Sequence, residues 1–178
     1  MRFFSEEKIS KLAFSILSSC LSEPNLDKLY RESSIDPKYR DPDILDAFQV
    51  FYGDTFLENL VSFCSLIRAT DDHRPYLSNF SNKLDPSIQI ITTISSTQNI
   101  DTRDIRESCN KIIHAREFKY TNVYIPTNPL YGNLEDSNPN NYLSPQLSLL
   151  GEFYKEKWEF IIHVVPLIVY SVQAFKSG

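Results

Sequence analysis

Glycine is scarce in this chain: only four of its 178 residues are glycine. Loops that cradle a phosphate or a dinucleotide need several closely spaced glycines, because the backbone must approach the ligand closely. No two glycines here fall within such a spacing. The sequence therefore excludes a P-loop and a dinucleotide-binding fingerprint.

Cysteine and histidine are also few, with three of each. Cys20, Cys64 and Cys109 form no CxxC pair, and each falls in an apolar helical register. This pattern predicts small buried residues in a reducing compartment rather than zinc knuckles or redox motifs. The histidines form no HxH or HxxxH motif. We therefore expect neither a metal site nor a cofactor.

A long hydrophobic run is missing. The longest, FIIHVVPLIVY, has eleven residues and contains a histidine and a proline, so it is too short to span a bilayer. The N-terminus, MRFFSEEKISK, becomes charged within six residues and therefore offers no hydrophobic signal-peptide region. We expect a cytoplasmic protein that does not enter a membrane.

The charge balance is acidic, with a net charge of -5 and a pI of about 5.2. An acidic surface repels nucleic acid and suits a basic protein partner. Hydrophobic residues make up 42% and aromatic residues 13% of the chain. At this length, that composition predicts one domain over residues 1–178 with an aromatic-rich core.

Apolar residues recur at helical spacing in the first two thirds of the chain. Ser5 is the expected N-cap of a first helix through Leu21, and a short helix is expected over Leu26–Glu32. Asp41-Pro42 predicts the start of a helix of about 26 residues ending near Ile67. Gly53 could kink or split this helix, and a polar loop is expected over Asp72–Asn82.

The segment 86–96 is ambiguous. Asp85-Pro86 repeats the cap-and-proline signal, and isoleucines at 88, 91 and 94 favour a helix. The same isoleucines, with Thr92 and Thr93, also permit a strand. Asp101 or Thr102 is the expected cap of a further helix that ends at His114.

The last third of the chain changes pattern. Phe118–Ile125 is aromatic and β-branched, and a long connector follows over residues 126–145. Leu147–Val164 predicts an antiparallel hairpin that turns near Tyr154–Glu156, with a last helix over Leu167–Lys176. The expected fold class is mainly α, a helical core with a small antiparallel β-hairpin or three-stranded sheet near the C-terminus.

The helix that ends at His114 carries the clearest candidate site. A helical projection places Ile105, Cys109 and Ile112 on one buried face. Polar side chains gather on the opposite side: Arg103, Arg106, Asn110 and His114. Three readings stay open for this stripe: a solvent-facing surface, a structural network or partner surface, and an RNase site.

Asn110-Lys111-Ile112-Ile113-His114 resembles the signature of the HEPN superfamily, helical domains that include many bacterial RNases of defence and toxin systems. That signature is an arginine, usually followed by Asn or another polar residue, and then a histidine after four to six intervening positions. Asn110 and His114 match its second and last positions. The resemblance implies RNA cleavage or RNA or nucleotide binding, and a homodimer in which two such helices meet.

The sequence departs from this signature at the arginine, where Cys109 stands instead. RNA cleavage by 2′-hydroxyl attack needs a base, which His114 could supply, and a cation beside the phosphate. Cys109 cannot be that cation. Arg106 is separated from His114 by seven residues, more than the four to six that the signature allows. The simplest interpretation is a degenerate site. Arg68 and His73, in RATDDH, also satisfy the spacing, which we attribute to chance.

Two functions therefore remain. The first is a non-enzymatic immunity or antitoxin protein of a bacterial toxin system that neutralises a basic nuclease toxin. The chain resembles such proteins in size and charge, and no sequence motif contributes to the resemblance. Its partner-binding candidates are the acidic residues Asp71, Asp72, Glu135 and Asp136. The second is a HEPN-like RNase or RNA-binding protein using His114, Asn110 and Arg106. His163 lies in an apolar segment and is expected to be a core or strand histidine. We expect no catalysis and no nucleic-acid partner.

Overall fold

The computed structural model describes residues 6–20, 42–73, 75–125, 142–153 and 155–177, and within them leaves out the side chains of 42–52, 120–125, 142–145 and 153. An N-terminal helix covers residues 6–20. The elements that follow are α2 (Pro42–His73), α3 (Leu77–Ser81), β1 (Ile91–Ser95), α4 (Ile105–His114), β2 (Glu117–Ile125), β3 (Tyr142–Phe153), β4 (Glu156–His163) and α5 (Val164–Ser177).

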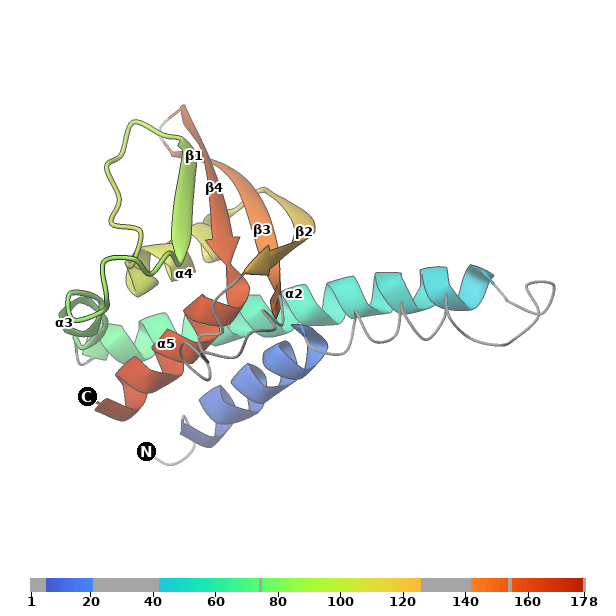
Figure 1. Cartoon of the computed structure of the whole chain (residues 1–178), viewed down its shortest axis with the longest axis horizontal. Coiled ribbons are helices and arrows are strands. Elements are labelled where there is room, and N and C mark those ends of the chain that lie inside the picture. The colour runs from blue at the N-terminus through green and yellow to red at the C-terminus, as the bar shows by residue number, and fades with distance from the viewer. Residues whose placement is uncertain (1–5, 21–41, 74, 126–141, 154, 178) are drawn as a thin grey trace, which may run out of the picture.

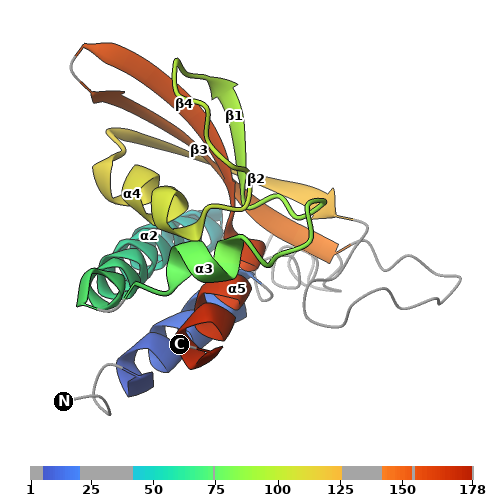
Figure 2. The same ribbon diagram turned by 90° about the vertical axis from the view of Figure 1, so that its left-hand side faces the viewer.

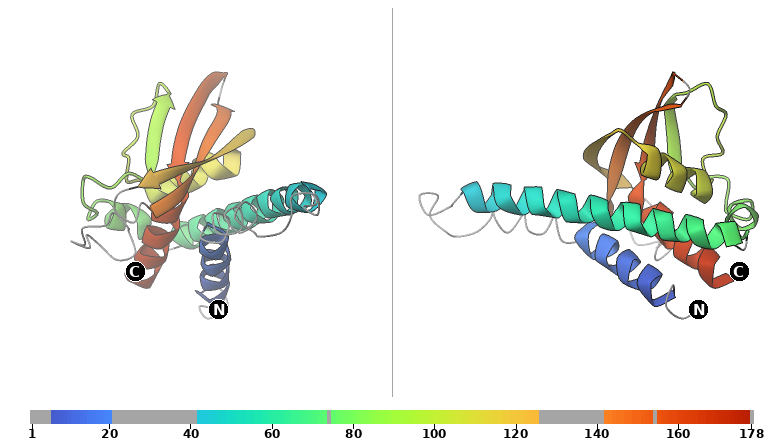
Figure 3. Two further views of the ribbon diagram at one scale, coloured as in Figure 1. Left: turned by 45° about the vertical axis from the view of Figure 1, so that its right-hand side comes forward. Right: turned by 180° about the vertical axis from the view of Figure 1, so that it is seen from behind.

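The described residues form a mainly helical fold with one antiparallel sheet. The strand order is β1-β4-β3-β2, and every neighbouring pair is antiparallel. The sheet stands on one side of the long helix α2, and the N-terminal helix lies on the other side (Figure 1). Helix α4 lies between the sheet and α2, as Figures 2 and 3 show from two directions. The candidate helix is therefore an internal layer of the fold.

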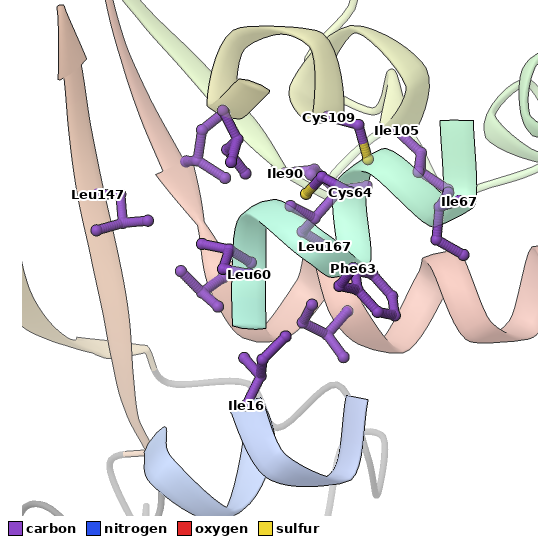
Figure 4. Close-up of a cluster of buried hydrophobic side chains, with 14 of the residues drawn as sticks. Ile16, Leu60, Phe63, Cys64, Ile67, Ile90, Ile105, Cys109, Leu147 and Leu167 are labelled. Atoms are coloured by element: carbon purple, nitrogen blue, oxygen red, sulfur yellow. The ribbon is translucent and has the colours of Figure 1, made fainter. Parts of the chain in front are cut away.

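One hydrophobic core joins these layers. It takes residues from the N-terminal helix, the other helices and the sheet, and ten of them are labelled in Figure 4. Ile16, Leu60, Ile112 and Leu147, from four different elements, are fully buried. Burial of this kind is the main favourable term in folding. No helix among the described residues is long and apolar enough to cross a membrane.

Several predicted elements are confirmed. The first helix buries Ile9, Ala13 and Ile16, as its apolar spacing predicts. The predicted hairpin is present as β3 and β4, the predicted last helix as α5, and the aromatic and β-branched segment 118–125 forms most of β2. Lys155 in the hairpin turn has φ of 71°, the left-handed conformation common in tight turns. Ser5, Asp41 and the short helix predicted over Leu26–Glu32 lie outside the described residues.

The long helix is longer than predicted. α2 is one helix, as predicted, without the split that Gly53 left open, and it continues to His73, so the loop starts later. α3 then forms inside the segment predicted to be a loop. Its start is held by Asp71, whose carboxylate accepts hydrogen bonds from the backbone N–H groups of Tyr76 (2.8 Å) and Leu77 (2.9 Å). Asp71 lies five residues before Tyr76, farther away than an ordinary N-cap residue, so the sequence pattern did not predict this cap.

The sheet is larger than predicted and begins earlier. It has four strands, and β1 forms in the middle of the chain, within the segment for which a helix was favoured. Asp85 does not start a helix, because its carboxylate accepts a hydrogen bond from the N–H of Ser87 (2.8 Å) and closes a turn. The predicted connector is also shorter, since residues 142–145 already belong to β3.

Candidate functional site on helix α4

Helix α4 begins at Ile105, two or three residues later than the predicted caps imply. Its N-cap is Asp104, whose carboxylate accepts a hydrogen bond from the N–H of Glu107 (2.9 Å). Burial raises the pKa of this Asp104 carboxyl. Asp101, one of the two predicted caps, instead binds Arg103 through a bidentate ion pair in the turn before the helix. Arg103 therefore does not belong to the helical stripe.

The predicted buried face of α4 is confirmed. Ile105, Cys109 and Ile112 are all fully buried. Cys109 lies against Cys64 of α2, both thiols are free, and burial raises the pKa of the Cys64 thiol. The position that carries arginine in the HEPN signature is therefore packed into the interface with α2 and faces no substrate.

Arg106 is engaged in an internal ion-pair network. Its guanidinium binds Asp71 and Asp72, the latter at 2.5 Å, at the end of α2. The hydrogen bond from Arg106 holds the pKa of the Asp72 carboxyl below its usual range. Asp71 is buried and also caps α3, so one carboxylate joins α2, α3 and α4.

The predicted acidic partner-binding residues divide into three cases. Asp71 points inward and is 3% exposed, so it offers no surface to a partner. The Asp72 side chain is 51% exposed but pairs with Arg106. Glu135 and Asp136 lie outside the described residues.

The two residues that match the HEPN signature lie one turn apart at the end of α4. The side-chain amide of Asn110 donates to Glu107 (3.0 Å), and the buried Oδ1 of Asn110 has no hydrogen-bond partner among the described residues. His114 is the last residue of the helix and is exposed. The guanidinium of Arg106 is bound to the acids of α2. It is therefore not free to form a phosphate-binding site together with His114.

Lys111 is a feature that the sequence did not reveal. Its side chain is 8% exposed and its ammonium group pairs with Glu107 (3.1 Å). It also donates to the side-chain oxygen of Gln98 (3.0 Å). The same nitrogen lies 4.7 Å from the Trp158 ring centre and 4.8 Å from that of Phe160. This cation–π contact attaches α4 to Trp158 and Phe160 of β4.

His163 is a buried strand histidine, as predicted. Its Nε2 lies 3.3 Å from the hydroxyl of Thr92 on β1, and its Nδ1 lies 3.1 Å from the amide nitrogen of Gln146 on β3. A neutral ring satisfies both contacts, because Nδ1 can accept from Gln146 while Nε2–H donates to Thr92. Burial lowers the pKa of His163. The ring therefore pins three strands together.

The remaining sequence candidates do not combine into a site. Arg68 and His73 lie near the end of α2, where the two acids between them bind Arg106. Within the part of the chain that the structure describes, no group of three His, Cys, Asp or Glu side chains is placed to hold a metal ion.

No family model matches this chain, and neither a curated protein nor a solved structure is significantly similar to it.

Proposed function

We propose that this chain is a non-enzymatic binding protein of the immunity or antitoxin type, which neutralises a basic partner such as a nuclease toxin. The observation that carries the proposal is the engagement of Arg106 by Asp71 and Asp72. Phosphate binding at Arg106 would require breaking two ion pairs, one of them to a buried carboxylate. The polar face of α4 is thus used to hold the fold together.

Two further observations support a protein-binding role. The net charge of -5 favours a basic partner and speeds its association. The arginine position of the HEPN signature is the buried Cys109, so no cation stands where phosphate chemistry needs one. On this proposal the protein acts in the cytoplasm, without a cofactor, by covering the active surface of its partner.

A second candidate, a HEPN-like RNA-binding protein or RNase, has two specific observations in its favour. His114 is exposed, and the Oδ1 of the neighbouring Asn110 lacks a partner among the described residues. Histidine is the side chain best suited to take a proton near neutral pH. This candidate would require Arg106, or a residue from a second copy, to supply the missing positive charge.

The test that separates the two candidates is incubation of the purified protein with total cellular RNA. Wild type, His114→Ala and Asn110→Ala are compared, and we expect all three to leave the RNA intact. Cleavage by wild type that is lost in His114→Ala would establish the RNase and overturn the binding-protein proposal.

The binding role itself is tested by protection of cells that express a cognate basic toxin. Reversal of two acids, Glu135→Lys with Asp136→Lys, should remove protection without unfolding the protein. Glu58→Lys, an exposed charge reversal on α2, is the control. Retained protection in the double variant would exclude this acidic segment as the binding surface.

A further inference from the structure

The sheet has two edge strands, and they differ in how open they are. β1 has only five residues, its register with β4 shifts between Thr93 and Ser95, and its Ile91 N–H already donates to the carbonyl of Thr102 (2.9 Å). Short, irregular and covered edges resist pairing with another chain. β2 has nine residues, contains no proline and pairs with β3 in unbroken register. Among the described strands, β2 is therefore the open edge of this sheet.

The direction of the backbone groups follows from the register. The N–H of His163 donates to the carbonyl of Ile90, so the backbone of His163 faces β1. Because successive residues of a strand face opposite neighbours, Ile162 faces β3, where its partner is Leu147. The backbone groups of Leu147 therefore face β4. Because the direction alternates along β3, the backbone groups of Ser148 and Leu150 face β2.

Leu150 and Ser148 pair with Glu117 and Lys119 of β2. The backbones of Glu117 and Lys119 therefore face β3, and the N–H and C=O of Phe118 between them face away from the sheet. The N–H of Arg116 also donates to the carbonyl of Leu150 (2.8 Å), so it too points toward β3 and is not available to a second chain. No described strand pairs with this outer side of β2, so the outward backbone groups of Phe118 can pair with a neighbouring strand.

The charges beside Phe118 indicate which strand would fit. Glu117 and Lys119 are exposed and project from the same face of β2. In an antiparallel pair related by a two-fold axis at Phe118, each Glu117 stands opposite Lys119 of the other copy. These are non-hydrogen-bonded pairs, whose side chains lie closest. Moving the axis to either charged residue would place like charges opposite each other.

We propose that the β2 edge binds a second copy of this chain, antiparallel about Phe118, so that the two sheets join into one. Backbone hydrogen bonds supply the attraction, and the two Glu117–Lys119 pairs set the register. The self-complementary charge pattern selects a second copy over an unrelated strand, which would need its own matching charges. This interface is independent of the polar face of α4 and of the proposed toxin partner.

Sedimentation velocity over a range of protein concentrations tests the proposal. We expect a dimer for wild type and weaker dimers for Lys119→Glu and Glu117→Lys, each by about tenfold in Kd, because each variant places like charges opposite twice per dimer. The double exchange Glu117→Lys with Lys119→Glu restores opposite charges and should recover the wild-type Kd.

Lys83→Glu, an exposed reversal in the turn after α3, carries the same charge change and should leave the Kd unchanged. A wild type that stays monomeric at all concentrations would overturn the proposal. A dimer that is insensitive to both single reversals would place the interface elsewhere, and single effects without rescue in the double exchange would exclude this register.

Discussion

The ammonium group of Lys111 is held by an acid, an amide and two aromatic rings, although lysine is a residue that is rarely buried. The long aliphatic stem can be buried while the charge finds partners at its end. A desolvated cation over aromatic faces contributes about 2 kcal/mol or more. The partners Trp158 and Phe160 are far away in the sequence, so a helical projection of α4 alone could not identify this contact.

The chain contains a matched pair of lysines for testing this contact. Lys111 and Lys11 both pair with a glutamate one turn earlier, but the Lys11 side chain is 75% exposed. We expect Lys111→Ala to lower the free energy of unfolding by about 2–4 kcal/mol, through the lost cation–π contact and the cavity. Lys11→Ala should leave it nearly unchanged. Urea denaturation measures both; equal effects would show that burial of Lys111 contributes nothing.

His163 makes stability depend on pH. Its ordinary pKa is 6.5, and burial lowers it in the folded state. The unfolded chain therefore binds the proton more readily, so the free energy of unfolding is highest above pH 6.5 and falls as the pH drops toward the folded-state pKa. Denaturation curves between pH 8 and pH 5 should show this loss, and His163→Gln should reduce it. The same exchange at the exposed His114 is the control; an unchanged slope in His163→Gln would contradict the assignment.

The candidate site was only partly predictable from single residues. The buried face of α4 followed from the spacing of Ile105, Cys109 and Ile112, because that signal is local and periodic. The partners of Arg106 are more than thirty residues earlier, and they were singled out in the sequence as surface acids. Their inward role depends on α2 running on to His73, a boundary that the pattern placed six residues too early.

At the scale of elements, the segment that contains β1 was the one that the sequence left open between helix and strand. Isoleucines three residues apart fit one face of a helix, yet Ile91 pairs with Ile162 and Thr92 with Ile161 in the sheet. Strand formation depends on such distant partners more than helix formation does. The hairpin β3–β4 was easier to predict, because its two apolar runs are joined by a short charged turn.

Two glycines in different elements should respond oppositely to the same substitution. Gly151 on β3 faces Trp158 on β4, and a methyl group at Gly151 would overlap the indole ring. We expect Gly151→Ala to lower the free energy of unfolding by about 1–3 kcal/mol. Gly53 lies inside α2 with open space at this position, so Gly53→Ala should raise stability by up to about 1 kcal/mol. Thermal denaturation of both variants measures these changes. An unchanged stability of Gly151→Ala would contradict the prediction and show that the indole ring moves aside.

At the scale of the whole molecule, the described elements share one core. The buried cluster runs from Ile9 of the N-terminal helix to Ala174 of α5, so segments from both ends of the chain depend on the same packing. Residues in one contiguous core are expected to unfold together. A single domain over residues 1–178 remains a prediction, and it requires that these segments unfold in one transition.

The three cysteines report on this cooperativity from three elements. Cys20 lies in the N-terminal helix, Cys64 in α2 and Cys109 in α4, and all three are buried and form no disulfide within the described part of the chain. Buried thiols react slowly with alkylating reagents, since the reagent must reach the sulfur and find it deprotonated. We expect iodoacetamide to label all three in a single denaturant transition that coincides with the loss of helical circular dichroism. Mass spectrometry of the labelled peptides resolves the sites. Labelling of Cys20 at clearly lower denaturant than Cys109 would show that the N-terminal helix unfolds separately, and the single-domain prediction would then be wrong.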